Sequence, residues 1–268
     1  SRLFTDTSRA SSSAGGGWRV ILDTLALADG EVTTARARAR GEPPDSARYT
    51  IAALDLGPSH FNSATGVGAV NIRRLVASSS APPATITHAA GSVALWKDSL
   101  RVELPVVRLP ATLARLDGRV RWDSGAPPQR LALEVRSDSL GFSDIAWITS
   151  LVPRGGRGRA IVRITDGLPG GAFRYAIDSI DARATDSHLR GRFVAEVGSA
   201  VSIRDLDLTA EPLDFALIRE LFGDSVPAAP WDGALRGRVR ATGGPLDRWR
   251  LDPSTLEFED RRVGSSRS

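Results

Sequence analysis

The amino-acid sequence predicts a mostly-β protein whose strands are antiparallel neighbours in one sheet, with short helices inserted between strand repeats. Turn-forming residues recur about every 8–12 residues, and the segments of about 6–9 residues between them alternate apolar with polar side chains. Because short turns join most of these segments, neighbouring strands are expected to be antiparallel. A single sheet with one apolar face would expose a broad apolar surface. We therefore expect the sheet to curl into a barrel, a sandwich or an open trough.

A repeated unit with a period of about 73 residues organises the second half of the chain. Residues 129–165 contain an alternating strand, a short helix, a Gly-rich turn and a second strand, and residues 204–244 follow the same plan. After each helix, Gly158-Arg159 is matched with Gly237-Arg238. A repeat of this kind predicts units stacked along an axis rather than a closed globule. The matched apolar pairs are Leu133 with Leu206, Leu140 with Leu213, Phe142 with Phe215, Ile145 with Ile218, and Ile148 with Leu221.

The N-terminal half is predicted to contain strands alone. A strand that begins at Trp18 is expected to end in a tight turn at Asp29-Gly30, and residues 31–40 and 48–56 form the next two strands. Residues 67–77 fit a strand better than a helix, because Gly and Ser residues flank them. Within residues 84–122, hairpin turns are predicted at Lys97-Asp98 and at residues 116–118. Pro105 and Pro110 limit the strand between these turns, since proline cannot donate to a sheet ladder.

The C-terminal half combines strands with two short helices. Each helix, starting at Phe142 or Phe215, carries apolar residues on one face but is only about two turns long, so it must lie against the sheet to be stable. We divide the chain into a linker (1–17), an N-terminal β segment (18–80), a repeating β segment (81–262) and a tail (263–268). The predicted strands of the C-terminal half are 159–165, 172–178, 180–185, 189–197, 201–208, 234–241, 249–252 and 255–259.

Composition excludes several classes of protein. With 268 residues, 41% hydrophobic and 25% charged, the chain can form a globular core and has no apolar run of about 18 residues that would span a membrane as a helix. It has no cysteine, which excludes disulfides and thiolate metal sites. Methionine is absent, the initiator included, and residues 1–6 lack the apolar region of a signal peptide. We therefore interpret the chain as an excised fragment or a processed segment, in which an upstream targeting signal or anchor would not be visible.

The positive charge is almost entirely arginine. Of 35 basic residues only Lys97 is a lysine, and the net charge is +4. The arginines alternate along strands, as in residues 36–40 and 236–240, and do not cluster with aromatic residues. They are interpreted as solvated strand faces, and nucleic-acid binding is not predicted because neither a concentrated basic stripe nor a known motif is present.

The sequence contains no recognisable catalytic, cofactor or metal site. His60, His88 and His188 lie in unrelated contexts, and Asp186-Ser187-His188 is predicted to be a hairpin turn rather than a triad. Asp178 with Asp181, and Asp205 with Asp207, follow the strand rhythm rather than forming an acid–base pair. The Gly-rich residues 155–159 lack the lysine of a phosphate-binding loop and are interpreted as a structural turn. We predict that the chain is not an enzyme.

Two short motifs resemble a known family. The pattern L-x-G-R-V-R occurs at residues 116–121 and 235–240, and S-L-x-F or P-L-x-F precedes each short apolar helix, at residues 139–142 and 212–215. With the repeat of helix, turn and strand, this is similar to the AsmA-like/TamB superfamily of Gram-negative envelope proteins. The resemblance covers residues 84–259. The chain departs from the full-length family in lacking an N-terminal anchor and a C-terminal partner-binding domain.

The resemblance implies a location, a shape and a function. Such proteins are periplasmic, anchored in the inner membrane by an N-terminal helix that is not present in this chain, and fold into a U-shaped, apolar-lined groove. They are linked to phospholipid movement between the two membranes, and the TamB branch to outer-membrane protein assembly. The expected partners are phospholipid acyl chains and, for the TamB branch, an outer-membrane assembly protein.

The apolar strand positions are the predicted groove lining. They would solvate acyl chains without specific contacts, because each buried CH₂ gains about 0.8 kcal/mol. Alternatively, the same residues fill a closed β core. Two further functions stay open: an assembly factor that templates other chains by strand addition, and an enzyme or carbohydrate-binding β domain. The predicted lining residues are Leu131, Leu133, Val135, Val162, Ile164, Phe193, Val197, Leu206, Leu208 and Val239.

Overall fold

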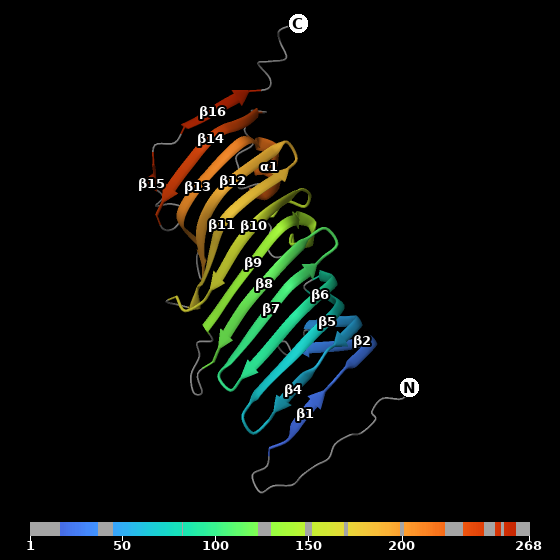
Figure 1. Cartoon of the computed structure of the whole chain (residues 1–268). Coiled ribbons are helices and arrows are strands. Elements are labelled where there is room, and N and C mark those ends of the chain that lie inside the picture. Colours follow the sequence, from blue (N-terminus) through green and yellow to red (C-terminus); the bar gives the residue numbers. More distant parts are fainter. Residues whose placement is uncertain are drawn as a thin grey trace, which may run out of the picture.

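The described residues form a single sheet that contains sixteen strands (Figure 1). The protein is represented by a computed structural model, which describes residues 17–36, 45–81, 83–122, 130–147, 152–168, 171–198, 201–222, 233–243, 250–252 and 255–260. Every strand pairing in it is antiparallel, so the predicted fold class is confirmed. Residues 1–16 of the predicted linker and the predicted tail at 263–268 lie outside the described residues.

The elements follow one another as a meander. Their bounds are β1 Arg19–Leu22, β2 Leu25–Arg36, β3 Asp45–Leu56, β4 Ser59–Asn62, β5 Val67–Ser80, β6 Pro83–Trp96, β7 Ser99–Arg108, β8 Leu113–Arg121, β9 Arg130–Gly141, the 3₁₀ turn η1 Phe142–Asp144, β10 Arg157–Thr165, β11 Phe173–Ala184, β12 Ser187–Val197, β13 Val201–Asp214, the helix α1 Phe215–Phe222, β14 Gly233–Thr242, β15 Arg250–Leu251 and β16 Thr255–Asp260.

The sheet is open at both ends. From β5 to β14 each strand pairs with the strand before it and the strand after it. At one end β3 and β4 both pair with β5, and β2 and β1 pair with β3 and β4 in turn. At the other end β15 and β16 both pair with β14. The sheet runs on without a break where β5 pairs with β6, which is the position predicted to separate two segments.

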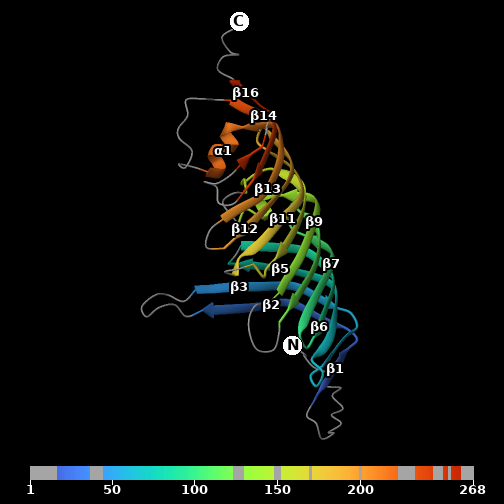
Figure 2. The same cartoon turned by 90° about the vertical axis from the view of Figure 1, so that its left-hand side faces the viewer.

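The sheet is curved into a trough. Figure 2 shows it from the side, with α1 on the concave side and the strands bending around it. Glycines allow this bend where neighbouring backbones approach closely. Gly91 has φ +151° and Gly191 has φ +144°, and a Cβ at either position would lie 2.0 Å from the carbonyl oxygen of Glu103 or Asp207 on the next strand. Only a residue without a side chain fits there.

The two faces of the sheet differ in chemistry. Residues paired directly across two antiparallel strands point to the same face. Between β13 and β14, Leu208 pairs with Val239 on one face, whereas Asp207 pairs with Arg240 on the other. Helix α1 marks the apolar face as the concave one, because its Leu217 packs against strand residues of that face, including Leu213.

The concave face is not a sealed core. Among the described residues, the hydrophobic residues that are fully buried are seven alanines, Phe142 (5% exposed) and Leu217 (3% exposed). The larger apolar side chains along the concave face keep part of their surface accessible. No second sheet covers them in the described part of the chain. The alternative of a closed β core is therefore wrong.

Two predicted turns lie inside strands. Strand β2 continues through Asp29-Gly30, because Ala28 and Gly30 keep their partners on β3 although Asp29 has φ +55°. Residues 116–118 lie in the middle of β8, and the chain reverses instead after Pro110, where the N–H of Leu109 donates to the carbonyl of Thr112. Turn chemistry is local, and the pairing of a whole strand overrides it. The turn at Lys97-Asp98 is confirmed.

The repeat is present, with three corrections. Strands 172–178 and 180–185 are one strand, β11, with a bulge between Ile177 and Ile180. The first predicted helix is a single 3₁₀ turn, η1, and Ile148 lies outside the described residues, whereas α1 has the predicted two turns. The register pairs Gly158 with Leu140 but Gly237 with Ala210, so the two Gly-Arg pairs do not occupy equivalent positions.

Candidate functional site: the concave apolar face

The ten predicted lining residues all lie on the concave face. They come from β9, β10, β12, β13 and β14, and the register joins most of them directly. Leu133 pairs with Ile164 and Val135 with Val162. Leu131 lies two residues before Leu133 on β9 and faces the same concave side. The pairs on the later strands are Phe193 with Leu206, Leu208 with Val239, and Val197 with Val201.

One row of apolar residues crosses eight consecutive strands, from β7 to β14. Each residue in this row pairs directly with the next, and seven strand spacings of about 4.8 Å give a row about 34 Å long. A second row of eight residues runs beside it from β6 to β13. The first row is Leu104, Leu116, Val135, Val162, Ile177, Phe193, Leu206 and Ala241. The second row is Val93, Val102, Gly118, Leu133, Ile164, Tyr175, Ala195 and Ile203.

The prediction covered only part of this surface. The lining continues through β6, β7, β8 and β11, none of whose residues were named in advance, although the same alternation was visible in residues 84–122. It also continues toward β2 and β3, where Leu27 pairs with Leu54. Bulges make the residues that face the groove harder to predict along a whole strand. Each one shifts which residues face the groove, and its place depends on the neighbouring strand.

A small apolar cap covers the concave face at one place. Its buried residues are Phe142 of η1, Ala184 of β11 and Leu217 of α1, with Leu140 and Val152 packed against them. The two repeat copies therefore meet in one cluster. The backbone N–H of Arg154 also donates to Glu220 Oε1 at 3.1 Å, which ties the Gly-rich turn to α1. The predicted packing of the short helices against the sheet is confirmed for α1.

The convex face is charged and carries cross-strand ion pairs. Arg163 Nε lies 2.5 Å from Asp178 Oδ2, and Arg238 bonds both oxygens of Asp207 at 2.6 Å. The hydrogen bond from Arg238 holds the pKa of Asp207 below its ordinary value. Pairs this exposed each contribute little to stability, since water screens them. The charged pairs make the convex face polar and hydrated, whereas the concave face is apolar.

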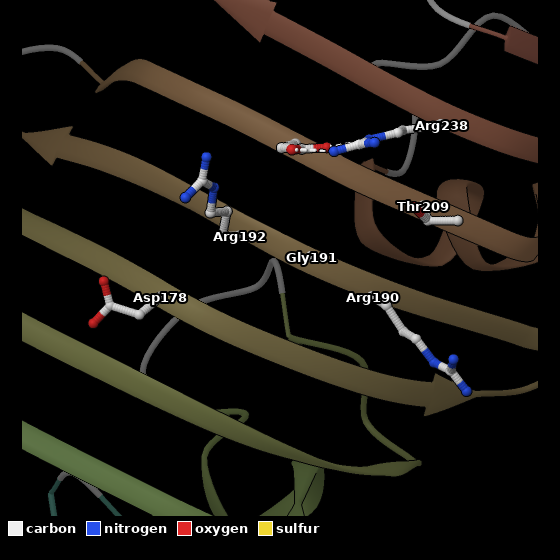
Figure 3. Close-up of a pocket in the computed structure, with 7 residues that line it drawn as sticks. Asp178, Arg190, Gly191, Arg192, Thr209 and Arg238 are labelled. Carbon is white, nitrogen blue, oxygen red and sulfur yellow. Dashed lines mark hydrogen bonds and ion pairs between the residues drawn. The ribbon is translucent and has the colours of Figure 1, made fainter.

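A hollow on the convex face is not a binding site. Figure 3 shows Arg190, Arg192 and Asp178 around it, pointing in different directions, while Arg238 is turned toward its partner carboxylate. Arg190 also lies 3.7 Å from Asp181 Oδ2. Because the charged groups do not converge on a common point, the hollow offers no position where one ligand atom could bind several of them.

The other sequence candidates have structural partners. His188 Nε2 lies 2.7 Å from Asp181 Oδ1, and this bond, with one from Arg159, lowers the pKa of Asp181. The Ser187 hydroxyl accepts the N–H of Asp214 at 2.8 Å, so residues 186–188 do not form a triad. The carbonyl of Gly156, in the Gly-rich turn, accepts the N–H of Phe142. Within the described ranges, no three His, Asp or Glu side chains are grouped as metal ligands.

Comparison with known proteins adds no family. The chain matches no protein-family model, no curated protein and no solved structure. In the part of the chain that the structure describes, no helix has both the length and the apolar character needed to cross a membrane.

Proposed function

We propose that the concave face is a groove for the acyl chains of phospholipids. The observation that carries this proposal is the unbroken apolar row across eight strands, which stays partly exposed in an open sheet. A soluble protein rarely leaves so large an apolar surface without a ligand or partner. With the resemblance to AsmA-like/TamB proteins, it supports a non-enzymatic segment of an inner-membrane-anchored periplasmic conduit between inner and outer membranes.

The physics of the groove suits a chain-like ligand. Each CH₂ group transferred from water to the concave face gains about 0.8 kcal/mol, so a long acyl chain is held without any specific contact. Because the apolar rows are uniform, an acyl chain can slide from one strand to the next at little cost in free energy. The open side of the trough leaves the polar headgroup in water. Movement of this kind requires no catalytic residue and no cofactor.

Neighbouring residues of β10 provide a matched test. Val162 faces the groove between Val135 and Ile177, whereas Ile161 lies on the convex face opposite Arg136 and Ser179. We expect Val162→Arg to weaken binding of a fluorescent phospholipid about 10-fold or more, because the charge must be desolvated beside the acyl chain. Ile161→Arg should stay within about two-fold of the parent. Equal binding by the two variants would contradict the proposal.

The open sheet edges favour a second function, strand addition to another β-chain. In the described residues β2 pairs only with β3, and β16 only with β14, so each has an unpaired edge. Edge strands of this kind can template an extended peptide. A Glu257→Pro substitution in β16 would weaken capture of an unfolded outer-membrane strand and leave phospholipid binding unchanged. If capture of the unfolded strand were unchanged in this variant, strand addition at β16 would be contradicted and the acyl-chain groove would stand alone.

A further inference from the structure

One margin of the convex face carries cations that face each other. The register pairs Arg101 with Arg119 and Arg121 with Arg130. Like charges directly opposite each other destabilise a sheet. Elsewhere on this face several arginines bond a carboxylate on the neighbouring strand, as Arg159 does with Asp181 at 2.8 Å. Two further Arg–Arg pairs, Arg115 with Arg136 and Arg157 with Arg183, lie toward the opposite ends of the strands. Arg–Arg pairs thus occur at both margins, and the first margin also carries Lys97 and Trp96.

Among the described residues, most of these cations have no carboxylate partner. Arg101 is 3.7 Å from Asp117 and also contacts Glu103. Within the described part of the chain, Arg119, Arg121 and Arg130 make no ion pair, and all three are exposed. Lys97 lies at the same margin, in the exposed turn that joins β6 to β7. The one described acid in that turn, Asp98, accepts a hydrogen bond from Ser99. Three described carboxylates, Asp98, Glu103 and Asp117, lie among these five cations, so the described part of the margin has excess positive charge.

An exposed tryptophan lies in the same row. Trp96 pairs with Ser99, and Ser99 pairs in turn with Arg121, so Trp96 shares the convex face with the arginines. Its side chain is 39% exposed, whereas Ser99 between them is 2% exposed. Trp beside Lys and Arg is the combination found where proteins meet the membrane–water interface, because the indole ring suits the headgroup region. We call Trp96 and the five cations, Lys97, Arg101, Arg119, Arg121 and Arg130, the basic rim.

We propose that the basic rim docks on the anionic headgroups of a phospholipid bilayer. Phosphate groups would neutralise the Arg–Arg pairs, because they supply negative charge that the neighbouring strands do not. The ring of Trp96 would enter the headgroup layer beside them. The rim lies at the ends of β6, β7, β8 and β9, at one long margin of the trough, so a planar surface can reach it. This site is on the opposite face from the groove and is independent of it.

Vesicle binding by the full chain tests the proposal. We expect binding to vesicles of phosphatidylcholine mixed equally with phosphatidylglycerol, little binding to phosphatidylcholine alone, and a decrease with added salt. The variant Arg119→Gln/Arg121→Gln should bind about 25-fold more weakly, at about five-fold for each charge removed. The control Arg159→Gln/Arg163→Gln removes the same net charge from the convex face, away from the rim. It should bind within about three-fold of the parent.

A tryptophan variant completes the test. Trp96→Ala should weaken vesicle binding and remove most of the fluorescence change that vesicles cause. Equal binding to both kinds of vesicle, or equal effects of the two arginine double variants, would overturn the proposal. It would also be overturned if Trp96→Ala had no effect and a short polyphosphate bound with the same dependence on Arg119 and Arg121, since the rim would then recognise soluble polyanions.

Discussion

The short elements that follow β9 and β13 lie at equivalent places in the sheet but differ in secondary structure. We call them the first and second caps. In the first copy β9 leads into η1, a single 3₁₀ turn, and in the second β13 leads into α1, a helix of eight residues. In both, a hydroxyl on a neighbouring strand or loop accepts the N–H of the residue before the cap. Thr112 Oγ1 accepts from Gly141 at 2.9 Å, and Ser187 Oγ from Asp214 at 2.8 Å. The scaffold is thus common to both copies.

The residue at the start of the cap accounts for the difference. Asp214 Oδ1 accepts the N–H of Ala216 at 2.7 Å, which satisfies one of the free donors of the first helical turn. Gly141, at the matching position, has no side chain to do so. An aspartate cannot simply replace it, because a Cβ at Gly141 would lie 2.4 Å from the Cβ of Ala111. We therefore expect this residue to favour a helix after β13 and a single turn after β9.

The largest effect should follow from removing the contact that joins the two caps. Leu217 is 3% exposed and packs with Phe142, so Leu217→Ala should lower the free energy of unfolding by about 3 kcal/mol. Urea denaturation would measure this. Leu256→Ala, at a concave-face position that is 46% exposed, is the control and should cost less than about 1 kcal/mol. Amide exchange should increase in both caps of the Leu217 variant. An increase in α1 alone would show that the caps are separate.

A smaller effect should follow from removing the cap residue itself. Asp214→Ala should lower the free energy of unfolding by about 1 kcal/mol and speed amide exchange at the start of α1, which makes the second cap resemble the first. Asp214→Asn should retain most of both properties, because asparagine is an equally good N-cap. If the alanine variant kept the amide protection of the parent, the N-cap would not be the cause of the difference.

The smallest effect concerns the charged face of the second copy. The hydrogen bond from Arg238 lowers the folded-state pKa of Asp207, so this carboxylate stabilises the fold above its unfolded pKa of about 3.9. That contribution is lost as the pH falls through the lower folded-state pKa. Asp207→Asn and Arg238→Gln should each flatten the loss of stability on acidification below about pH 4. Thermal melts across this range would measure it, and an unchanged pH profile in both variants would contradict the assignment.

Alternation along the strands was enough to predict the antiparallel sheet and one wall of the groove. Leu133 and Ile164 lie on the same face, as expected, because the period of two survives across β9 and β10. What failed depended on non-local pairing. Asp29-Gly30 is turn-forming in isolation but lies within a paired strand. The first short element is a 3₁₀ turn rather than the predicted helix, and Gly141 before it offers no side chain to cap a helix. The basic rim was missed because Arg121 and Arg130 become neighbours only through the register.

Photo-crosslinking at two adjacent positions distinguishes the lipid contacts of the concave face from those of the convex face. A photoreactive amino acid is placed at residue 162 in one variant and at residue 161 in another, and each purified full chain is irradiated with a labelled phospholipid. We expect a lipid adduct at residue 162 on the concave face and little or none at residue 161 on the convex face. Equal labelling at the two positions, or labelling at residue 161 alone, would contradict the assignment of the apolar concave face as the acyl-chain groove.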